Sequence, residues 1–141
     1  MTSDEHLFAS LATRRLLRKD GPLRVEGRQV WIESLLYRDI VTQLGTPLLV
    51  YSSARLRDNI SEAIAAGRAC PHPIRIHFAL KACYLIGVVS LVREAGLNVE
   101  VMSEFEYLLA RRVGFTPDQV VVNGPAKRGE FLERAVTDGV S

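Results

Sequence analysis

The chain has 141 residues, of which 48% are hydrophobic and 24% are charged, a composition typical of a soluble globular domain. Its net charge of +2 indicates no strong attraction to nucleic acid or to an anionic membrane. Its two cysteines, Cys70 and Cys83, cannot build a disulfide framework, and no zinc-ligand spacing is present. The first residues lack the pattern of a signal peptide, and no apolar stretch is long enough to span a membrane. We therefore predict a cytoplasmic protein without a metal site, a nucleic-acid partner or a membrane partner.

The first half of the chain predicts short elements. Residues 1–21 are polar and rich in arginine, which indicates an N-terminal tail or a short helix. Residues 23–32 alternate between apolar and polar side chains around Gly27, which predicts two short strands joined by a turn. The expected elements that follow are a helix over residues 35–44, a strand over 47–51 and a helix over 54–66.

From residue 74 onward, a strand followed by a helix is predicted three times. The strands are expected over residues 74–80, 98–102 and 119–122, and the helices over residues 85–95, 103–113 and 127–137. This rhythm predicts parallel βαβ units with right-handed crossovers. Both a doubly wound sheet and a TIM-type barrel fit it. Because a barrel needs roughly 250 residues, we expect this chain to hold only part of one.

Lys81 is the first candidate for chemistry, because it comes directly after the strand predicted over residues 74–80. The carboxyl ends of parallel strands face the active site in α/β folds. Neighbouring apolar side chains are expected to desolvate the Lys81 amine, which favours a nucleophilic amine able to attack a carbonyl. The structural alternative is a lysine that extends into solvent at a strand end.

Three polar residues lie within or just after the second strand of this series. Ser103 and Glu106 have the spacing of a capping box, which is a sufficient structural explanation for both. The helix that begins at Ser103 also starts at the carboxyl end of its strand, and it therefore faces the same edge of the predicted sheet as Lys81. Glu100 interrupts an apolar strand, and its carboxylate points either inward, near a cofactor, or outward as a surface charge.

Four segments resemble, in order, motifs of the fold-type III pyridoxal-phosphate-dependent amino-acid decarboxylases, the diaminopimelate and ornithine decarboxylase group. The segments are residues 45–51 (GTPLLVY), 78–82 (FALKA), 100–106 (EVMSEFE) and 120–127 (VVVNGPAK). They are similar to the family patterns GTPLYVY, YAVKAN, D-V-x-S-x-x-E and I-x-F-x-G-x-x-K. The first segment points toward the diaminopimelate branch, which serves lysine biosynthesis.

The resemblance implies an α/β fold for residues 22–141: an incomplete TIM-type (β/α)8 barrel of the alanine racemase-like fold, preceded by short strands. A C-terminal β domain would be absent from this chain, and residues 1–141 alone are expected to be catalytically inert. Pyridoxal 5'-phosphate would form a Schiff base with Lys81, which makes Lys81 the catalytic residue. The cofactor-binding residues implied are Lys81, Ala79, Glu100, Ser103 and Glu106. The substrate would be a basic or diamino acid, and the full-length form would be a homodimer.

Three departures from the family pattern bear on the reaction. Cys83 stands where the family usually has Asn, Glu100 stands where it usually has Asp, and Glu104-Phe105 replaces Gly-Gly. Two alternatives therefore stay open beside decarboxylation: a fold-type III racemase, and a truncated, non-catalytic cofactor-binding or assembly module.

Overall fold

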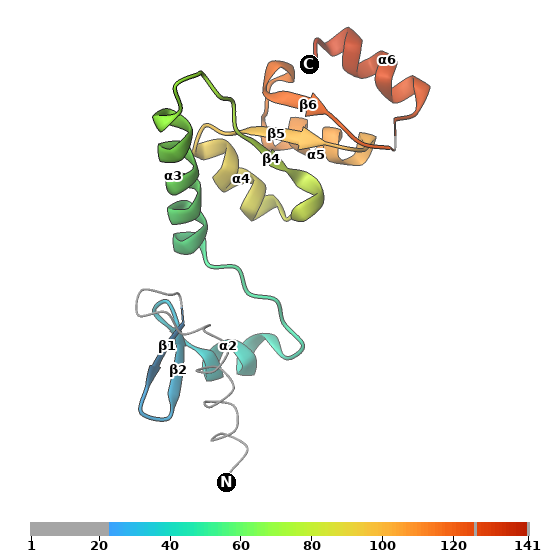
Figure 1. Ribbon diagram of the computed structural model, residues 1–141. Coiled ribbons are helices and arrows are strands. Elements are labelled where there is room, and N and C mark those ends of the chain that lie inside the picture. Colours follow the sequence, from blue (N-terminus) through green and yellow to red (C-terminus); the bar gives the residue numbers. More distant parts are fainter. Residues whose placement is uncertain (1–22, 126, 141) are drawn as a thin grey trace. The chain divides into compact units, whose positions relative to one another are not determined.

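The structure is a computed structural model that describes residues 23–125 and 127–140 (Figure 1). The chain divides into two compact units, residues 1–55 and residues 56–141. The tail or short helix predicted over residues 1–21 lies outside the described residues. Within the described ranges, no helix is both long and apolar enough to cross a membrane.

The first unit contains a three-stranded antiparallel sheet and a short helix. Its strands are β1 (Leu23–Glu26), β2 (Gln29–Ile32) and β3 (Leu35–Leu36), in the order β1-β2-β3. As predicted, β1 and β2 pair around a turn, in which Gly27 adopts a φ of +59°. Helix α2 (Tyr37–Leu44) ends at Gly45, as expected, but it begins two residues later because Leu35 and Leu36 pair with β2.

Two sequence predictions around the next helix are wrong. Residues 47–51 form no strand, because they pair with no other strand among the described residues, and the Leu49 side chain is largely exposed. Helix α3 (Ser53–Ala69) does not stop before Gly67 but continues past it. A Cβ atom at Gly67 would lie 3.1 Å from Ile76 Cδ1. This glycine therefore serves close packing and does not end the helix.

The second unit is built on a parallel sheet whose strands follow one another in the order β4-β5-β6. The strands are β4 (His77–Ala79), β5 (Asn98–Val101) and β6 (Val120–Val122). The α-helices between and after them are α4 (Ile86–Glu94), α5 (Glu104–Val113) and α6 (Gly129–Asp138). Two 3-10 turns complete the unit: η1 (Leu80–Ala82) and η2 (Pro117–Gln119).

Periodicity left two architectures open, and the observed strand order fits a barrel wall. Right-handed crossovers between strands in sequential order place their helices on one face of the sheet, whereas a doubly wound sheet needs a reversal of order. Val99, Val101 and Val120 are 0% exposed and pack in one core cluster with Val89 of α4 and Ala110 of α5. The second unit is therefore a section of barrel wall, with its helices on the outer face (Figure 1).

The buried side of α5 differs from the prediction. The apolar pattern over residues 103–113 predicts that Phe105, Leu108 and Leu109 face inward, but Phe105 and Leu108 are 63% and 50% exposed. The buried residues are instead Glu106, Tyr107 and Ala110. Tyr107 is buried because its ring packs against Phe131 of α6, a contact that the periodicity of α5 does not indicate.

Tyr107 connects α5 to α6. Its side chain is 1% exposed, its ring centroid lies 5.8 Å from that of Phe131, and its hydroxyl donates a hydrogen bond to the Asp138 carboxylate. Burial is the main cause that raises the pKa of Tyr107 from 10.0 to about 12, and the hydrogen bond to Asp138 adds to it. The phenol therefore keeps its proton to a higher pH in the folded chain than in the unfolded chain.

This difference predicts how stability depends on alkaline pH. The stabilisation from the Tyr107 proton is complete below the unfolded pKa of 10.0 and is lost as the pH rises toward about 12. The loss amounts to about 3 kcal/mol, since one pKa unit corresponds to about 1.4 kcal/mol. Urea unfolding across this range should show the loss in the unmodified chain but not in Tyr107→Phe. Tyr84→Phe, a change at an exposed tyrosine, should retain it; an identical pH profile for Tyr107→Phe and the unmodified chain would contradict the assignment.

Candidate functional site

Lys81 lies in η1, immediately after β4 and at the carboxyl end of the parallel sheet. Its neighbour Leu80 is 0% exposed and anchors the turn in the core. The Cys83 backbone N–H donates to the Leu80 carbonyl oxygen at 3.0 Å and closes the turn. The backbone that carries Lys81 is therefore held in place by a buried side chain before it and a hydrogen bond after it.

Glu100 is the partner of Lys81. The Lys81 Nζ and Glu100 Oε1 atoms are 3.4 Å apart, and the Glu100 side chain is 24% exposed. Strand register pairs Glu100 with Ala79 on β4 and with Val121 on β6, so these three residues share a face of the sheet. The valines on either side of Glu100 face the helices. Glu100 therefore points to the inner face of the barrel wall, which decides between its two predicted orientations.

The expected desolvation of Lys81 is wrong for this chain. The Lys81 side chain is 55% exposed. Its apolar neighbour Leu80 points into the core between sheet and helices, whereas the amine extends along the inner face. With more than half of its side chain exposed, Lys81 presents an amine that is accessible to solvent.

Ser103 and Glu106 shape the turn between β5 and α5. Ser103 is the N-cap residue of α5, and its Oγ accepts a hydrogen bond from the Glu106 backbone N–H at 3.3 Å. Glu106 is 7% exposed, and its Oε2 accepts from the Met102 backbone N–H at 2.8 Å. The predicted capping box is thus formed on the serine side, whereas the Glu106 carboxylate reaches one residue further back, to Met102.

Gly124 brings the carboxyl end of β6 against that of β5. It adopts a φ of +157°, and a Cβ atom there would lie 2.4 Å from Met102 Cβ. The Asn123 backbone N–H donates to the Val101 carbonyl oxygen at 2.9 Å. The Asn123-Gly124-Pro125 sequence after the third strand predicts a loop in which the glycine permits close backbone approach, but it does not show that Met102 is the contact.

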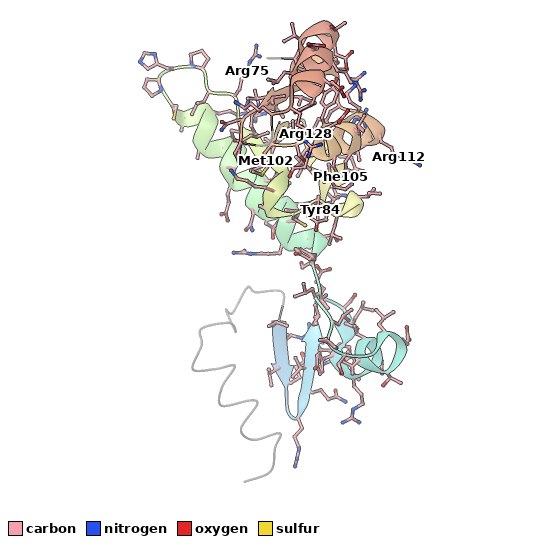
Figure 2. The ribbon with its side chains drawn as sticks, turned by 90° about the vertical axis from the view of Figure 1, so that its right-hand side faces the viewer. Arg75, Tyr84, Met102, Phe105, Arg112 and Arg128 are labelled. Atoms are coloured by element: carbon pink, nitrogen blue, oxygen red, sulfur yellow. The ribbon has the colours of Figure 1, made fainter. Side chains whose placement is uncertain are left out.

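An aromatic pair at the same end of the sheet was missed in the sequence. Tyr84 follows η1, Phe105 lies in the first turn of α5, and their rings meet edge to face with centroids 6.0 Å apart (Figure 2). Tyr84 is 58% exposed and Phe105 is 63% exposed. The signal available was the replacement of the family's Gly-Gly by Glu104-Phe105.

The site presents an accessible primary amine beside a carboxylate, at the end of the sheet where α/β folds bind ligands. A primary amine is the group that bonds to a carbonyl carbon. Among residues 23–125 and 127–140, no group of three or more His, Cys, Asp or Glu side chains could hold a metal ion. The side chains present therefore fit an aldehyde cofactor attached through Lys81.

The chain belongs to the pyridoxal-dependent decarboxylases: residues 57–141 match the pyridoxal binding domain of that family. The matched range contains Lys81, Glu100, Ser103 and Glu106, and pyridoxal phosphate is the cofactor that the family relationship assigns.

Named relatives agree with this family. The chain is 30% identical to a diaminopimelate decarboxylase of Aquifex aeolicus over 126 residues, which are 89% of this chain and 28% of the relative. It is 33% identical to the diaminopimelate decarboxylase of Archaeoglobus fulgidus over 121 residues, 86% of this chain and 26% of the relative. The chain therefore spans little more than a quarter of the length of these relatives.

Solved structures agree on the fold. A crystal structure of a protein from Aquifex aeolicus superposes with a TM-score of 0.77 at 27% identity, covering 84% of this chain and 28% of that one. A diaminopimelate decarboxylase from M. jannaschi gives a TM-score of 0.78 at 20% identity, with the same coverage. The fold is thus the N-terminal part of the alanine racemase-like barrel, as the family resemblance implied.

Proposed function

We propose that the protein carrying this chain decarboxylates diaminopimelate or a related basic amino acid, with pyridoxal phosphate held by Lys81. The observation that carries this proposal is the accessible Lys81 amine at the carboxyl end of β4, 3.4 Å from Glu100. The names of the curated relatives support diaminopimelate as the substrate. A cytoplasmic homodimer, as the resemblance implies, is part of the same proposal.

Each site residue of this chain would have a role in cofactor binding that follows from its position. Lys81 would hold the cofactor through its amine, and Glu100 would keep that amine directed along the inner face. Ala79, which shares this face, leaves room beside Glu100 because its side chain is a single methyl group. Ser103 and Glu106 would complete the cofactor-binding set at the end of β5. When bound, pyridoxal phosphate accepts the electron pair of the carbon–carbon bond that decarboxylation breaks.

Chemical labelling of the natural protein that carries this chain tests the role of Lys81. The protein is mixed with an equimolar amount of pyridoxal phosphate, reduced with borohydride, digested and analysed by mass spectrometry. The pyridoxyl group should be found on Lys81, and Lys81→Arg should remove it, because a guanidinium does not attack the aldehyde. Lys127→Arg, a change at an exposed lysine, should leave the labelling unchanged. Equal labelling of Lys81 and Lys127 would contradict the proposal.

A further inference from the structure

A groove lies at the opposite end of the sheet from Lys81. It has a volume of about 550 Å³ and lies between the last turns of α3, the connector over residues 70–76 and the turn that enters β5. Figure 2 shows Arg75, on this connector, and Tyr84, near Lys81, at opposite ends of the second unit. The groove is therefore separate from the site proposed for pyridoxal phosphate.

The floor of the groove is apolar and its walls are polar. Ile64, Ile76 and Leu97 belong to the core cluster or pack against it, and they form the floor. The polar groups are the guanidiniums of Arg68 and Arg75, the imidazole of His72 and the amide of Asn98. A few convergent polar groups over an apolar base are typical of small-molecule sites.

The charged residues that line the groove favour an anionic ligand. The lining contains two arginines and no aspartate or glutamate. Among the described residues, neither Arg68 nor Arg75 makes an ion pair or a side-chain hydrogen bond. An arginine fork without a carboxylate partner binds phosphate oxygens in pairs.

The groove is also fixed in shape before any ligand binds. The Cys70 N–H donates to the Gly67 carbonyl oxygen at 3.3 Å as α3 ends, and the Asn98 N–H donates to the Ile76 carbonyl oxygen at 3.1 Å. Between these two anchors, Pro71 and Pro73 restrict the backbone on both sides of His72. A restricted connector lowers the entropy that ligand binding would cost.

We propose that this groove binds the phosphate group of a small phosphate monoester, with Arg68 and Arg75 as the anchoring residues. A dianionic phosphate matches two guanidiniums, His72 and Asn98 can donate further hydrogen bonds, and the apolar floor would contact the organic part of the ligand. The proposal does not depend on the reaction proposed for Lys81.

Cys70 provides the test, because its free thiol is exposed and lines the groove. Alkylation by iodoacetamide is followed by mass spectrometry while inorganic phosphate is titrated into the natural protein that carries this chain, with chloride holding the ionic strength constant. Phosphate should slow alkylation of Cys70 about fivefold or more, since a bound oxyanion hydrogen-bonded to both guanidiniums shields the thiol. Cys83, the other free thiol, lies beyond the far end of β4 and serves as the internal control.

Three variants make the test specific. Arg68→Gln and Arg75→Gln should each weaken the phosphate protection of Cys70 about tenfold, the scale of one charge-assisted hydrogen bond. Arg112→Gln, at an exposed arginine of α5, should leave it unchanged, and all three should give the circular dichroism spectrum of the unmodified chain. Protection of neither cysteine, equal protection of both, or equal protection by acetate would overturn the proposal. Lys81→Ala should not alter protection, so the two proposals fail independently.

Discussion

Lys81→Ala is expected to lower the decarboxylation rate of the natural protein about a thousandfold or more, the scale on which loss of a covalent catalytic group acts. The reason is that Lys81 supplies the only amine on the inner face of the described barrel wall, next to Glu100. The measurement is carbon dioxide release from diaminopimelate, ornithine, lysine and arginine. Diaminopimelate should be the best substrate.

Lys81→Arg distinguishes the positive charge of the lysine from its nucleophilic amine. An arginine retains the positive charge and can still pair with Glu100, but it lacks a nucleophilic amine. If attachment of the cofactor is the role of Lys81, the arginine variant should be as inactive as the alanine variant and should melt at the temperature of the unmodified protein. If arginine instead restored most of the activity, the charge alone would be sufficient and the proposed role would be wrong. Lys127→Ala is the matched control and should keep full activity.

Gly124→Ala is expected to lower the free energy of unfolding of the chain by about 3 kcal/mol, from backbone strain and steric overlap together. Gly124 has a φ of +157°, which side chains rarely tolerate, and a new Cβ would lie 2.4 Å from Met102 Cβ and 3.1 Å from Met102 Cα. Because a backbone atom is among these contacts, rotation of the Met102 side chain cannot relieve them. Relief requires the carboxyl ends of β5 and β6 to separate.

Gly129→Ala is the control for this prediction. Gly129 begins α6, and a Cβ there would meet nothing within 4 Å. Alanine is favoured over glycine in helices, so the change should be neutral or stabilising by up to about 1 kcal/mol. Urea unfolding of the two variants compares them directly. Equal stability of Gly124→Ala and Gly129→Ala would show that the contact with Met102 is not tight in solution.

The alternation of strands and helices from residue 74, and the position of Lys81 at a strand end, could be predicted from the amino-acid sequence alone. Both depend on local patterns: side-chain periodicity marks each element, and glycines such as Gly114, which adopts a left-handed conformation, mark helix ends. The site residues could be named for the same reason, because the segments that carry them are short and continuous. Their roles rest on family resemblance.

The direction in which the site residues face depends on tertiary packing and could not be predicted from local patterns. Alternation along β5 gives Glu100 two possible directions, and the helices packed on Val99 and Val101 leave it the inner one. Local patterns also did not show which aromatic side chain of α5 is buried. Tyr107 is buried because α6 packs against it, whereas Phe105 is exposed.

The periodicity of the sequence likewise did not distinguish a barrel wall from a doubly wound sheet. The distinction depends on strand order, which is a matter of pairing between residues about 20 positions apart, such as Ala79 with Glu100. Local periodicity carries no information about such pairing, because the same apolar strand can join a sheet on either side of its neighbour. The 55% exposure of the Lys81 side chain is likewise a feature of the folded chain and not of the local sequence pattern.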